Sequence, residues 1–279
     1  MMHEFGVRVG PVGFRIGSAW RSPVRALSRL YRDYPPLDGV PDLTVRLEPT
    51  RPWRRWLRPS VAIAGDYWLP DALPLPLAHG LLTAEMGMNL QVALGWRRHL
   101  LLHASAVERD GRVLLMTGAS GSGKSTLSVM LAEAGWRFLA DEFAFVGLDD
   151  GRVHPFPRPA SLKNESIAAV GADGPVLEGT PKGRIGYRRP PASALARMGE
   201  AAPPALLLFP RFGYPQALAP VPPSETFVRL TQASTNYVAL GEAGFIALTR
   251  LVASVPAVAV DYPDGSSGLR LVERLWSEA

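Results

Sequence analysis

Residues 118–126 read Gly-Ala-Ser-Gly-Ser-Gly-Lys-Ser-Thr and complete a G-x-x-x-x-G-K-[ST] phosphate loop. The apolar stretch 112–117 before it predicts a strand, and residues 124–134 after it predict a helix that ends at Gly135. A strand, a glycine-rich turn and a helix in this order direct backbone N–H groups and the positive end of the helix dipole toward an anion. The chain is therefore expected to fold as an α/β protein around the phosphates of a nucleotide, ATP in the first instance.

Each residue type of the loop has a chemical task. Its glycines let the backbone approach phosphate oxygens closely, Lys124 is expected to reach the β- and γ-phosphates, and Ser125 is expected to bind Mg²⁺. The predicted nucleotide-binding residues of the loop are Gly118, Ser120, Gly121, Ser122, Gly123, Lys124, Ser125 and Thr126. The competing interpretation is a Gly/Ser-rich turn before an ordinary helix.

Composition limits the class of protein. The 279 residues are 47% hydrophobic, which leaves room for one large domain or two modest ones. No cysteine is present, which excludes a disulfide framework, a thiolate zinc site and a cysteine nucleophile. The N-terminus lacks the basic and apolar pattern of a secretory signal, and no uncharged run approaches the length of a membrane span. We therefore expect a cytoplasmic protein with no membrane partner.

The formal net charge of +5 does not predict a nucleic-acid partner, because the arginines are scattered rather than gathered in one tract. The densest basic segment, residues 51–58, sets arginines beside Trp53 and Trp56. Such a segment either stacks on bases or holds an acidic peptide, or it is a solvated loop with its tryptophans tucked against the body. The sequence leaves these interpretations open.

Residues 1–97 are predicted to form a small α+β N-terminal region. Two short strands are expected within residues 4–16, and further strands at 42–48 and 61–64. A helix is expected at 22–31 with Ser22 as its cap, and a long amphipathic helix at 77–96.

Residues 98–279 are predicted to form the catalytic domain around the loop. Its expected strands are 100–107, 112–117, 137–141, 143–148, 205–209 and 257–260, and its expected helices after the loop are 124–134, 224–231, 242–254 and 267–278. Residues 155–204 show no sustained periodicity and are interpreted as loops that face the substrate.

A pair of carboxylates returns toward the loop. Asp141 and Glu142 end an apolar strand, and Asp141 follows Lys124 by only 17 residues. A carboxylate at this place either binds Mg²⁺ or accepts the proton of an attacking hydroxyl. The alternative is a turn aspartate and a surface glutamate. Asp149 and Asp150 precede a glycine and indicate a hairpin turn instead.

Three further residues are candidates. His103 lies on a strand expected beside the loop's strand, where an imidazole suits proton handling, although a histidine in such a strand is more often a satisfied structural residue. Lys163 and Lys182 lie in the irregular region of a chain in which arginine supplies most cations. A lysine delivers a compact charge to a crowded phosphate, so both loops are expected to fold over the nucleotide or substrate. The alternative is two incidental surface lysines.

The order of His103-Ala-Ser, the loop ending at Ser125, and Leu139-Ala-Asp-Glu142 resembles HPr kinase/phosphorylase. The chain is more similar still to the group called HprK-related kinase A. That similarity is carried by residues 161–164, 180–183, 209–211, 236–237 and 241–245 and covers roughly residues 98–262. The resemblance implies a P-loop kinase of the phosphoenolpyruvate carboxykinase type, with a mixed, strongly bent sheet and helices packed outside.

By position, the resemblance implies Lys124 on phosphate, Ser125 on Mg²⁺, Asp141 as the catalytic base or a metal-side carboxylate, and His103 beside it. Glu142 stands where HPr kinase has a second aspartate, and the segment that contacts HPr is not recognisable. HPr is therefore not the expected substrate. Relatives of this type are associated with PqqD-like peptide-binding domains. Arg211 follows the strand 205–209 and is a candidate for neutralising charge on the transferred phosphoryl group.

The leading hypothesis is an ATP- and Mg²⁺-dependent kinase of a serine or threonine hydroxyl in a peptide or small protein, with a PqqD-like domain as a conceivable partner. Its predicted catalytic residues are Asp141, His103, Lys124 and Arg211, and its predicted metal ligands are Ser125, Asp141 and Glu142. One alternative is a kinase of a free amino acid or sugar. Another is a nucleotide-gated scaffold with little turnover. The sequence leaves the oligomeric state open, a homo-oligomer included.

Overall fold

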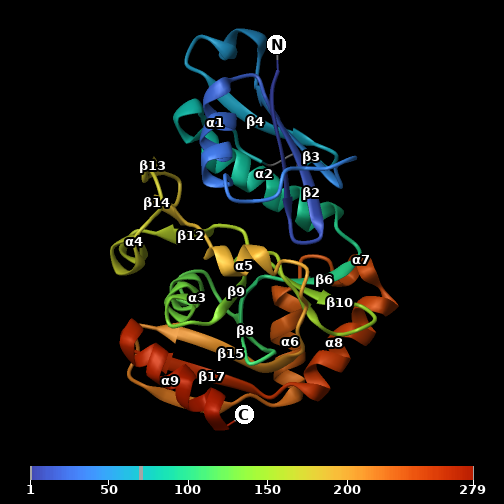
Figure 1. The fold of residues 1–279 in the computed structure, drawn as a ribbon, viewed down its shortest axis with the longest axis vertical. Helices are drawn as coiled ribbons and strands as arrows, with labels where there is room; N and C mark the ends of the chain where they lie inside the picture. The colour runs from blue at the N-terminus through green and yellow to red at the C-terminus, as the bar shows by residue number, and fades with distance from the viewer. Residues whose placement is uncertain (1, 69–71, 279) are drawn as a thin grey trace. The chain divides into compact units, whose positions relative to one another are not determined.

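A computed structural model describes residues 2–68 and 72–278, and the chain divides into two compact units, Met1–Trp96 and Arg97–Ala279 (Figure 1). The protein is a mixed α/β protein with several sheets. Among the described residues, none of the helices is both long and apolar enough to cross a bilayer.

The first unit is a five-stranded sheet in the order β1-β2-β3-β4-β5. Its strands are β1 (His3–Val9), β2 (Val12–Ser18), β3 (Leu43–Pro49), β4 (Ser60–Gly65) and β5 (Leu75–Pro76); its helices are α1 (Arg21–Leu30) and α2 (Gly80–Gly95), with 3-10 turns η1 (Pro52–Arg55) and η2 (Leu77–His79). The predicted strands and both predicted helices are confirmed. The buried residues of the strands alternate with less buried ones, as expected of a sheet with one covered face.

Two details of the first unit differ from prediction. The helix α1 begins at Arg21 behind Trp20, and Ser22 lies exposed in its first turn instead of capping it. A side-chain hydrogen bond instead holds the backbone just before the helix, where the Trp20 N–H donates to Ser18 Oγ (3.1 Å). The helix α2 is not amphipathic, since 10 of its 16 residues are buried, on all sides of the helix.

The basic-aromatic segment 51–58 forms the turn η1, in which Arg54 and Arg55 stack on the adjacent Trp53 and Trp56. Trp53 is 44% exposed and Trp56 is 76% exposed. The expectation that these tryptophans are tucked against the body is therefore wrong.

The second unit contains three sheets, in the orders β11-β10-β6, β12-β14-β13 and β16-β17-β15-β8-β7-β9. Its strands are β6 (His99–Leu102), β7 (Ala104–Arg109), β8 (Arg112–Thr117), β9 (Arg137–Ala140), β10 (Ala144–Gly147), β11 (Val153–His154), β12 (Ala160–Lys163), β13 (Leu177–Thr180), β14 (Gly183–Arg188), β15 (Pro204–Phe212), β16 (Ala217–Pro220) and β17 (Ala257–Tyr262). Its helices are α3 (Lys124–Glu133), α4 (Glu165–Val170), α5 (Ala192–Ala196), α6 (Pro223–Ala233), α7 (Tyr237–Leu240), α8 (Glu242–Ser254) and α9 (Gly265–Glu278).

Helices cover both faces of the six-stranded sheet, because its central strands are apolar on both sides. In β8, Val113 and Leu115 belong to a cluster with residues of α6 and α8, whereas Leu114 and Met116 belong to a cluster with residues of α3 and α9. A strand that is buried on both faces has a continuous apolar sequence, which explains the apolar stretch 112–117 before the phosphate loop. The loop's strand β8 thus lies inside this doubly covered sheet, between β15 and β7 (Figure 1).

The direction of the strands brings several chain segments to one edge of this sheet. β17, β15 and β8 are parallel, and β7 is antiparallel to both β8 and β9. β8 and β9 therefore end at the edge where β7 begins. Consequently the loop after Thr117, Asp141 after β9, and His103 before β7 lie at the same edge.

The predicted strand 100–107 is two strands that belong to different sheets. The chain turns at His103, whose N–H donates to Ala233 O (2.8 Å) and whose carbonyl accepts a bond from Thr117 Oγ1 (2.9 Å). The expected single bent sheet is accordingly divided between β6 and β7. The expectation of irregular loops over residues 155–204 is also wrong in part, because β12, β13 and β14 form a small antiparallel sheet there.

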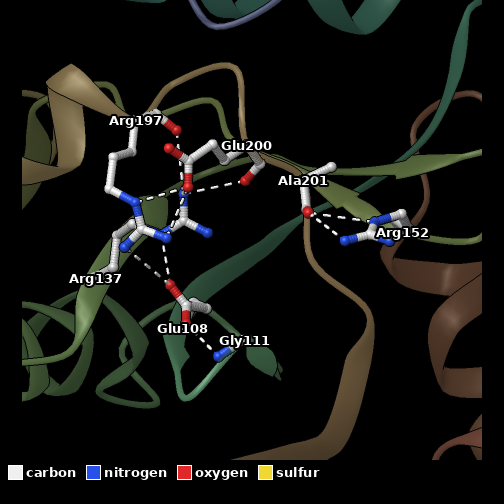
Figure 2. Close-up of polar contacts among 7 residues, drawn as sticks. All are labelled: Glu108, Gly111, Arg137, Arg152, Arg197, Glu200 and Ala201. Atoms are coloured by element: carbon white, nitrogen blue, oxygen red, sulfur yellow. Dashed lines mark hydrogen bonds and ion pairs between the residues drawn. The ribbon is translucent and has the colours of Figure 1, made fainter.

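A buried ion pair joins β7 to β9. Arg137 Nε donates to Glu108 Oε2 (2.5 Å), and each side chain is only 6% exposed. The other oxygen of Glu108 accepts a bond from Gly111 N–H (2.7 Å), and Arg137 also donates to the carbonyls of Arg197 and Glu200 (Figure 2). Both oxygens of Glu108 and the Nε and Nη1 groups of Arg137 thus have partners, as a buried ion pair requires.

The stability of the protein is expected to fall on acidification because of His99. Burial is the main cause that lowers the pKa of His99 to about 4, and the neighbouring His154 ring, whose centroid lies 4.6 Å away, lowers it further. The Asp150 carboxylate opposes this shift, whereas Arg98 adds to it. The unfolded chain therefore binds more protons than the folded one between pH 4 and pH 6.5, and the free energy of unfolding falls there as pH falls. Between pH 7 and pH 5 the loss is about 1–2 kcal/mol.

Urea unfolding of the wild type and of His99→Gln at both pH values measures this loss. The glutamine variant is expected to lose less stability on acidification than the wild type. An equal loss in the two proteins would assign the pH dependence to other groups.

Candidate functional site

The phosphate loop has the backbone that its glycines predict. Gly121 and Gly123 have φ of 85° and 92°, in the left-handed region that favours glycine. A Cβ at Gly123 would lie 2.4 Å from Tyr262 Oη, so this position also needs a residue without a side chain. α3 begins at Lys124, which aims the free N–H groups of its first turn into the loop.

Lys124 lies folded over the loop. Its Nζ donates to the carbonyls of Gly118 (2.7 Å) and Ala119 (2.9 Å), which fixes the ammonium group within the loop. Burial lowers the pKa of Lys124, although the Asp141 and Glu142 carboxylates raise it in part. The Asp141 and Glu142 carboxylates and the carbonyl oxygens of the loop therefore stabilise this cation together.

Asp141 is fully enclosed at the end of β9. Its Oδ1 accepts bonds from Ser105 Oγ (2.7 Å) and Ser125 Oγ (2.8 Å), and its Oδ2 accepts a bond from Ser161 N–H (3.2 Å). Burial, followed by the Glu142 charge, raises the pKa of Asp141, and the three hydrogen bonds oppose this rise. The bond to Ser125 directly connects the carboxylate to the first turn after the loop.

Glu142 has a strained backbone and lies beside His103. Its φ of 73° lies in the left-handed region, which is uncommon for a residue with a side chain. Its Oε2 lies 3.4 Å from His103 Nε2. The hydrogen bond to His103 outweighs burial and, with the charges of Lys163 and Arg158, lowers the pKa of Glu142 to about 2. Strain of this kind persists where the surroundings hold a residue in place for a task.

One cavity of about 780 Å³ gathers most of the predicted residues, and we call it the Lys124 cavity. Its lining includes Lys163 and Lys182, which come from β12 and the β13–β14 turn. The other predicted residues that line it are His103, Ser120, Gly121, Gly123, Lys124, Ser125, Thr126, Asp141 and Glu142. All three lysines of the chain therefore face one cavity.

The remaining predicted residues line a second cavity of about 730 Å³, which we call the Arg211 cavity. Gly118, Ser122 and Arg211 belong to it. The Arg211 guanidinium is 62% exposed and makes two hydrogen bonds to Asp261 (2.8 and 2.5 Å). The structure thus does not bring Arg211 together with Lys124 and Asp141 in one cavity.

Sequence reasoning missed Ser105 and Ser161, both of which donate to Asp141. Ser105 is completely buried between the apolar residues Ala104 and Ala106, and a buried hydroxyl is a signal that a hydrogen-bond partner exists. Ser161 contributes only its backbone N–H, which any residue but proline supplies. No sequence pattern could have found it.

The oxygen donors at this end of the cavity fit a bound Mg²⁺. Among the described residues, no cluster of three or more histidine and carboxylate side chains could hold a metal by itself. Mg²⁺ in nucleotide sites, however, is bound by one or two protein oxygens together with phosphates and waters. Ser125 Oγ and Asp141 Oδ1, 2.8 Å apart, supply a hydroxyl and a carboxylate of this kind.

Comparison with known proteins finds likeness only among solved structures. No family model and no curated protein matches the chain. Among solved structures, the HPr(Ser) kinase/phosphatase from Coxiella burnetii is similar at 13% identity, over 64% of this chain and 99% of that one, with a TM-score of 0.29. A likeness of this size assigns neither a family nor an activity to the chain.

Proposed function

We propose that the chain is an ATP- and Mg²⁺-dependent kinase that transfers the γ-phosphate to a serine or threonine hydroxyl of a peptide or small protein. One observation carries this proposal: a single cavity contains the loop's lysine, a serine bonded to a buried aspartate, and a second carboxylate paired with a histidine. Binding phosphate needs only the loop and its lysine, whereas phosphoryl transfer also needs a metal ligand and a group that orients the acceptor hydroxyl or takes its proton.

The charges in the Lys124 cavity support a nucleotide triphosphate. Lys124 and the N–H groups of the loop would contact the β- and γ-phosphates, and Lys163 and Lys182 add two cations on the opposite wall. Thr126 Oγ1 donates to Ser166 Oγ (2.9 Å), which joins the first turn of α3 to α4 on that wall. The triphosphate would thus lie between the loop and the β12–β14 sheet.

In the proposed transfer, the oxygen of the acceptor hydroxyl forms a bond to the γ-phosphorus while the bond from that phosphorus to the β,γ-bridging oxygen breaks. ADP leaves with the electron pair, and the hydroxyl proton passes to the Asp141 carboxylate and then to water. Mg²⁺ would supply neutralisation of the phosphate charge, with the Ser125 hydroxyl as its protein ligand, while Asp141, which is hydrogen-bonded to Ser125, takes the proton. His103 and Glu142 would hold the acceptor beside the γ-phosphate.

Replacing Lys124 by alanine is expected to weaken ATP binding by roughly 10- to 100-fold, because hydrogen bonds from a charged group contribute about 1.5–3 kcal/mol. Titration of a fluorescent ATP analogue, with and without Mg²⁺, measures this change. Arg274→Ala is the matched control, since Arg274 is an exposed cation on α9 that lines neither cavity.

The same proteins then receive radiolabelled ATP with serine-containing peptides, free amino acids or sugars. Phosphate on a peptide supports the proposal. Phosphate on a free amino acid or sugar would show instead that the acceptor is a small molecule. If the wild type and Lys124→Ala bind ATP equally well, the loop is not the nucleotide site and the proposed function fails.

A further inference from the structure

The Lys124 cavity has two chemically different ends, one on each side of the phosphate loop. The six-stranded sheet has the order β16-β17-β15-β8-β7-β9, and β17, β15, β8 and β9 all end at the same edge (Figure 1). The loop follows β8, so Asp141 after β9 lies on one side of it, whereas Phe212 and Tyr262, which end β15 and β17, lie on the other. All three residues line the cavity.

The end at Asp141 is polar and belongs to the proposed transfer site. Glu142 and His103 line it as well, and His103 also lines the Arg211 cavity, so it lies at the junction of the two cavities. β15 lies three strand positions from β9, a separation of about 14 Å, which is on the scale of a nucleoside triphosphate. A nucleotide whose γ-phosphate lies at Asp141 therefore extends across the loop toward β15 and β17.

The other end of the cavity is apolar and aromatic, and we call it the Phe212 wall. It consists of Leu127, Met130, Phe212, Tyr262 and residues 264–266. Phe212 is 47% exposed, and its ring lies edge-to-face with the Tyr262 ring at a centroid distance of 5.8 Å. A half-exposed aromatic ring in the lining of a cavity offers apolar surface on which a planar base can stack.

Close packing holds the parts of the Phe212 wall together. A Cβ at Gly265, the first residue of α9, would lie 2.7 Å from Met130 Sδ, so the backbone of α9 is in close contact with this thioether. A Cβ at Gly268 would lie 2.9 Å from the Tyr262 ring, which is only 2% exposed. The wall is therefore formed before any ligand binds, as is usual for small-molecule sites.

The polar side chains of the Phe212 wall carry no fixed pattern for reading the edge of a base. Both oxygens of Asp264 accept bonds from Ser267, one from its N–H (2.8 Å) and one from its hydroxyl (2.9 Å), which caps the first turn of α9. The Tyr262 hydroxyl faces Ser122 O (3.5 Å). The remaining side-chain hydroxyl of the wall, that of Ser266, can donate or accept and so suits adenine and guanine alike.

We infer that the Phe212 wall binds the base of the phosphoryl donor by stacking and apolar contact, so that the donor class is the purine nucleoside triphosphates, GTP as well as ATP. This inference rests on the proposed function and adds the place of the base and the breadth of the donor. Phe212 contributes most to base affinity, because it is the exposed ring of the wall. The loop and Lys124 bind the phosphates whichever purine is attached.

Two aromatic residues on one segment provide a matched test. Phe212→Ala removes the ring from the wall, and Tyr214→Ala removes a ring that is 51% exposed and lines neither cavity. Both full-length variants and the wild type are titrated by calorimetry with ATP, GTP and inorganic triphosphate. Mg²⁺ is left out so that no transfer occurs during the titration.

Phe212→Ala is expected to bind ATP and GTP about 5- to 100-fold more weakly than the wild type, the range that loss of a base–aromatic stack gives. It is expected to bind inorganic triphosphate as the wild type does, because that ligand has no base. Tyr214→Ala is expected to keep all three affinities. The wild type is expected to bind ATP and GTP within about threefold of each other.

Three results overturn the inference. The first is equal ATP affinity in Phe212→Ala and Tyr214→Ala. The second is an equal loss of ATP and triphosphate affinity in Phe212→Ala, because that would show a disturbed phosphate loop instead of a lost stack. The third is a wild type that binds GTP roughly tenfold or more weakly than ATP, because a group that reads the base edge would then exist.

Lys124→Ala separates this inference from the proposed function. It is expected to weaken the binding of ATP and of inorganic triphosphate alike, because both ligands depend on the loop. If Lys124→Ala binds ATP as tightly as the wild type, the proposed function fails. If Lys124→Ala weakens ATP binding and Phe212→Ala does not, the base site fails and the kinase proposal stands.

Photolabelling of the wild type tests the place of the base without any variant. An ATP analogue with a photoreactive azide on its base is bound and irradiated, and the modified peptides are identified by mass spectrometry. Modification is expected at Phe212 or within residues 127–130 or 262–266. Modification confined to other segments, such as 217–219 in the Arg211 cavity, overturns the inference.

Discussion

Replacing Asp141 by asparagine is expected to lower the rate of phosphoryl transfer by about 10²–10⁴-fold, the range that a positioned general base contributes. Asparagine keeps the shape of the side chain and can still accept the hydrogen bonds of Ser105 and Ser125. It removes the negative charge and the ability to take a proton. Single-turnover transfer of radiolabelled phosphate measures the rate.

A measurement of nucleotide binding distinguishes a loss of the transfer step from general damage to the nucleotide site. Without Mg²⁺, the asparagine variant is expected to bind the ATP analogue within about threefold of the wild type, because Lys124 and the loop are unchanged. His103→Gln is the matched comparison at the cavity junction, and it is expected to lose less activity than Asp141→Asn. Full transfer activity in Asp141→Asn with a large loss in His103→Gln would assign the proton to the histidine.

The sequence was sufficient to predict the parts of the site that are local. The loop, its strand and α3 follow from one continuous segment, because the glycines, the apolar run and the helix signals lie within a few residues of one another. The place of Asp141 followed from chain length alone, since 17 residues suffice for one helix and a return strand. These elements are determined by residues that are close together in the sequence, so the sequence alone is sufficient to predict them.

The parts that failed depend on contacts between distant residues. The break at His103 is caused by bonds to Thr117 and Ala233, and neither partner is recognisable from the apolar run 100–107. The sheet within residues 155–204 is short and exposed on β13, so it lacks the apolar alternation that predicts strands. The separation of Arg211 from Lys124 into two cavities likewise arises from the path of the whole sheet.

Several departures from the expected local structure share a location. The strand break, the left-handed Glu142 and the two unpredicted donors to Asp141 all lie at the edge where β7 begins and β9 ends. Local preference is overruled where the structure needs a particular arrangement of groups. The concentration of such departures around Asp141 supports the assignment of this edge as the functional one, independently of the loop motif.

Replacing Glu108 by glutamine is expected to lower the free energy of unfolding by about 3–5 kcal/mol, because it leaves the Arg137 cation buried without its counter-charge. Glutamine can still accept the bond from Gly111 N–H, but its NH₂ group then replaces the oxygen that accepts the bond from Arg137 Nε, so the variant loses that hydrogen bond together with the charge. Urea unfolding at neutral pH measures the loss. The matched control is Glu178→Gln, whose partner Arg184 is exposed, and it is expected to cost less than about 1 kcal/mol.

The ion pair also determines where Asp141 lies. Glu108 and Arg137 are direct partners across β7 and β9, and the register shifts between Ala106 and Val107 before β9 reaches its end. β7 carries Ser105 and β9 leads into Asp141, so slippage of this pairing would separate the two. Glu108→Gln is therefore expected to reduce phosphoryl transfer even under conditions in which the protein remains folded. A large loss of stability with full transfer activity would show that apolar residues hold the strand pairing in register. A loss of stability no greater than that of Glu178→Gln would show that Arg197 and Glu200 rearrange to satisfy Arg137.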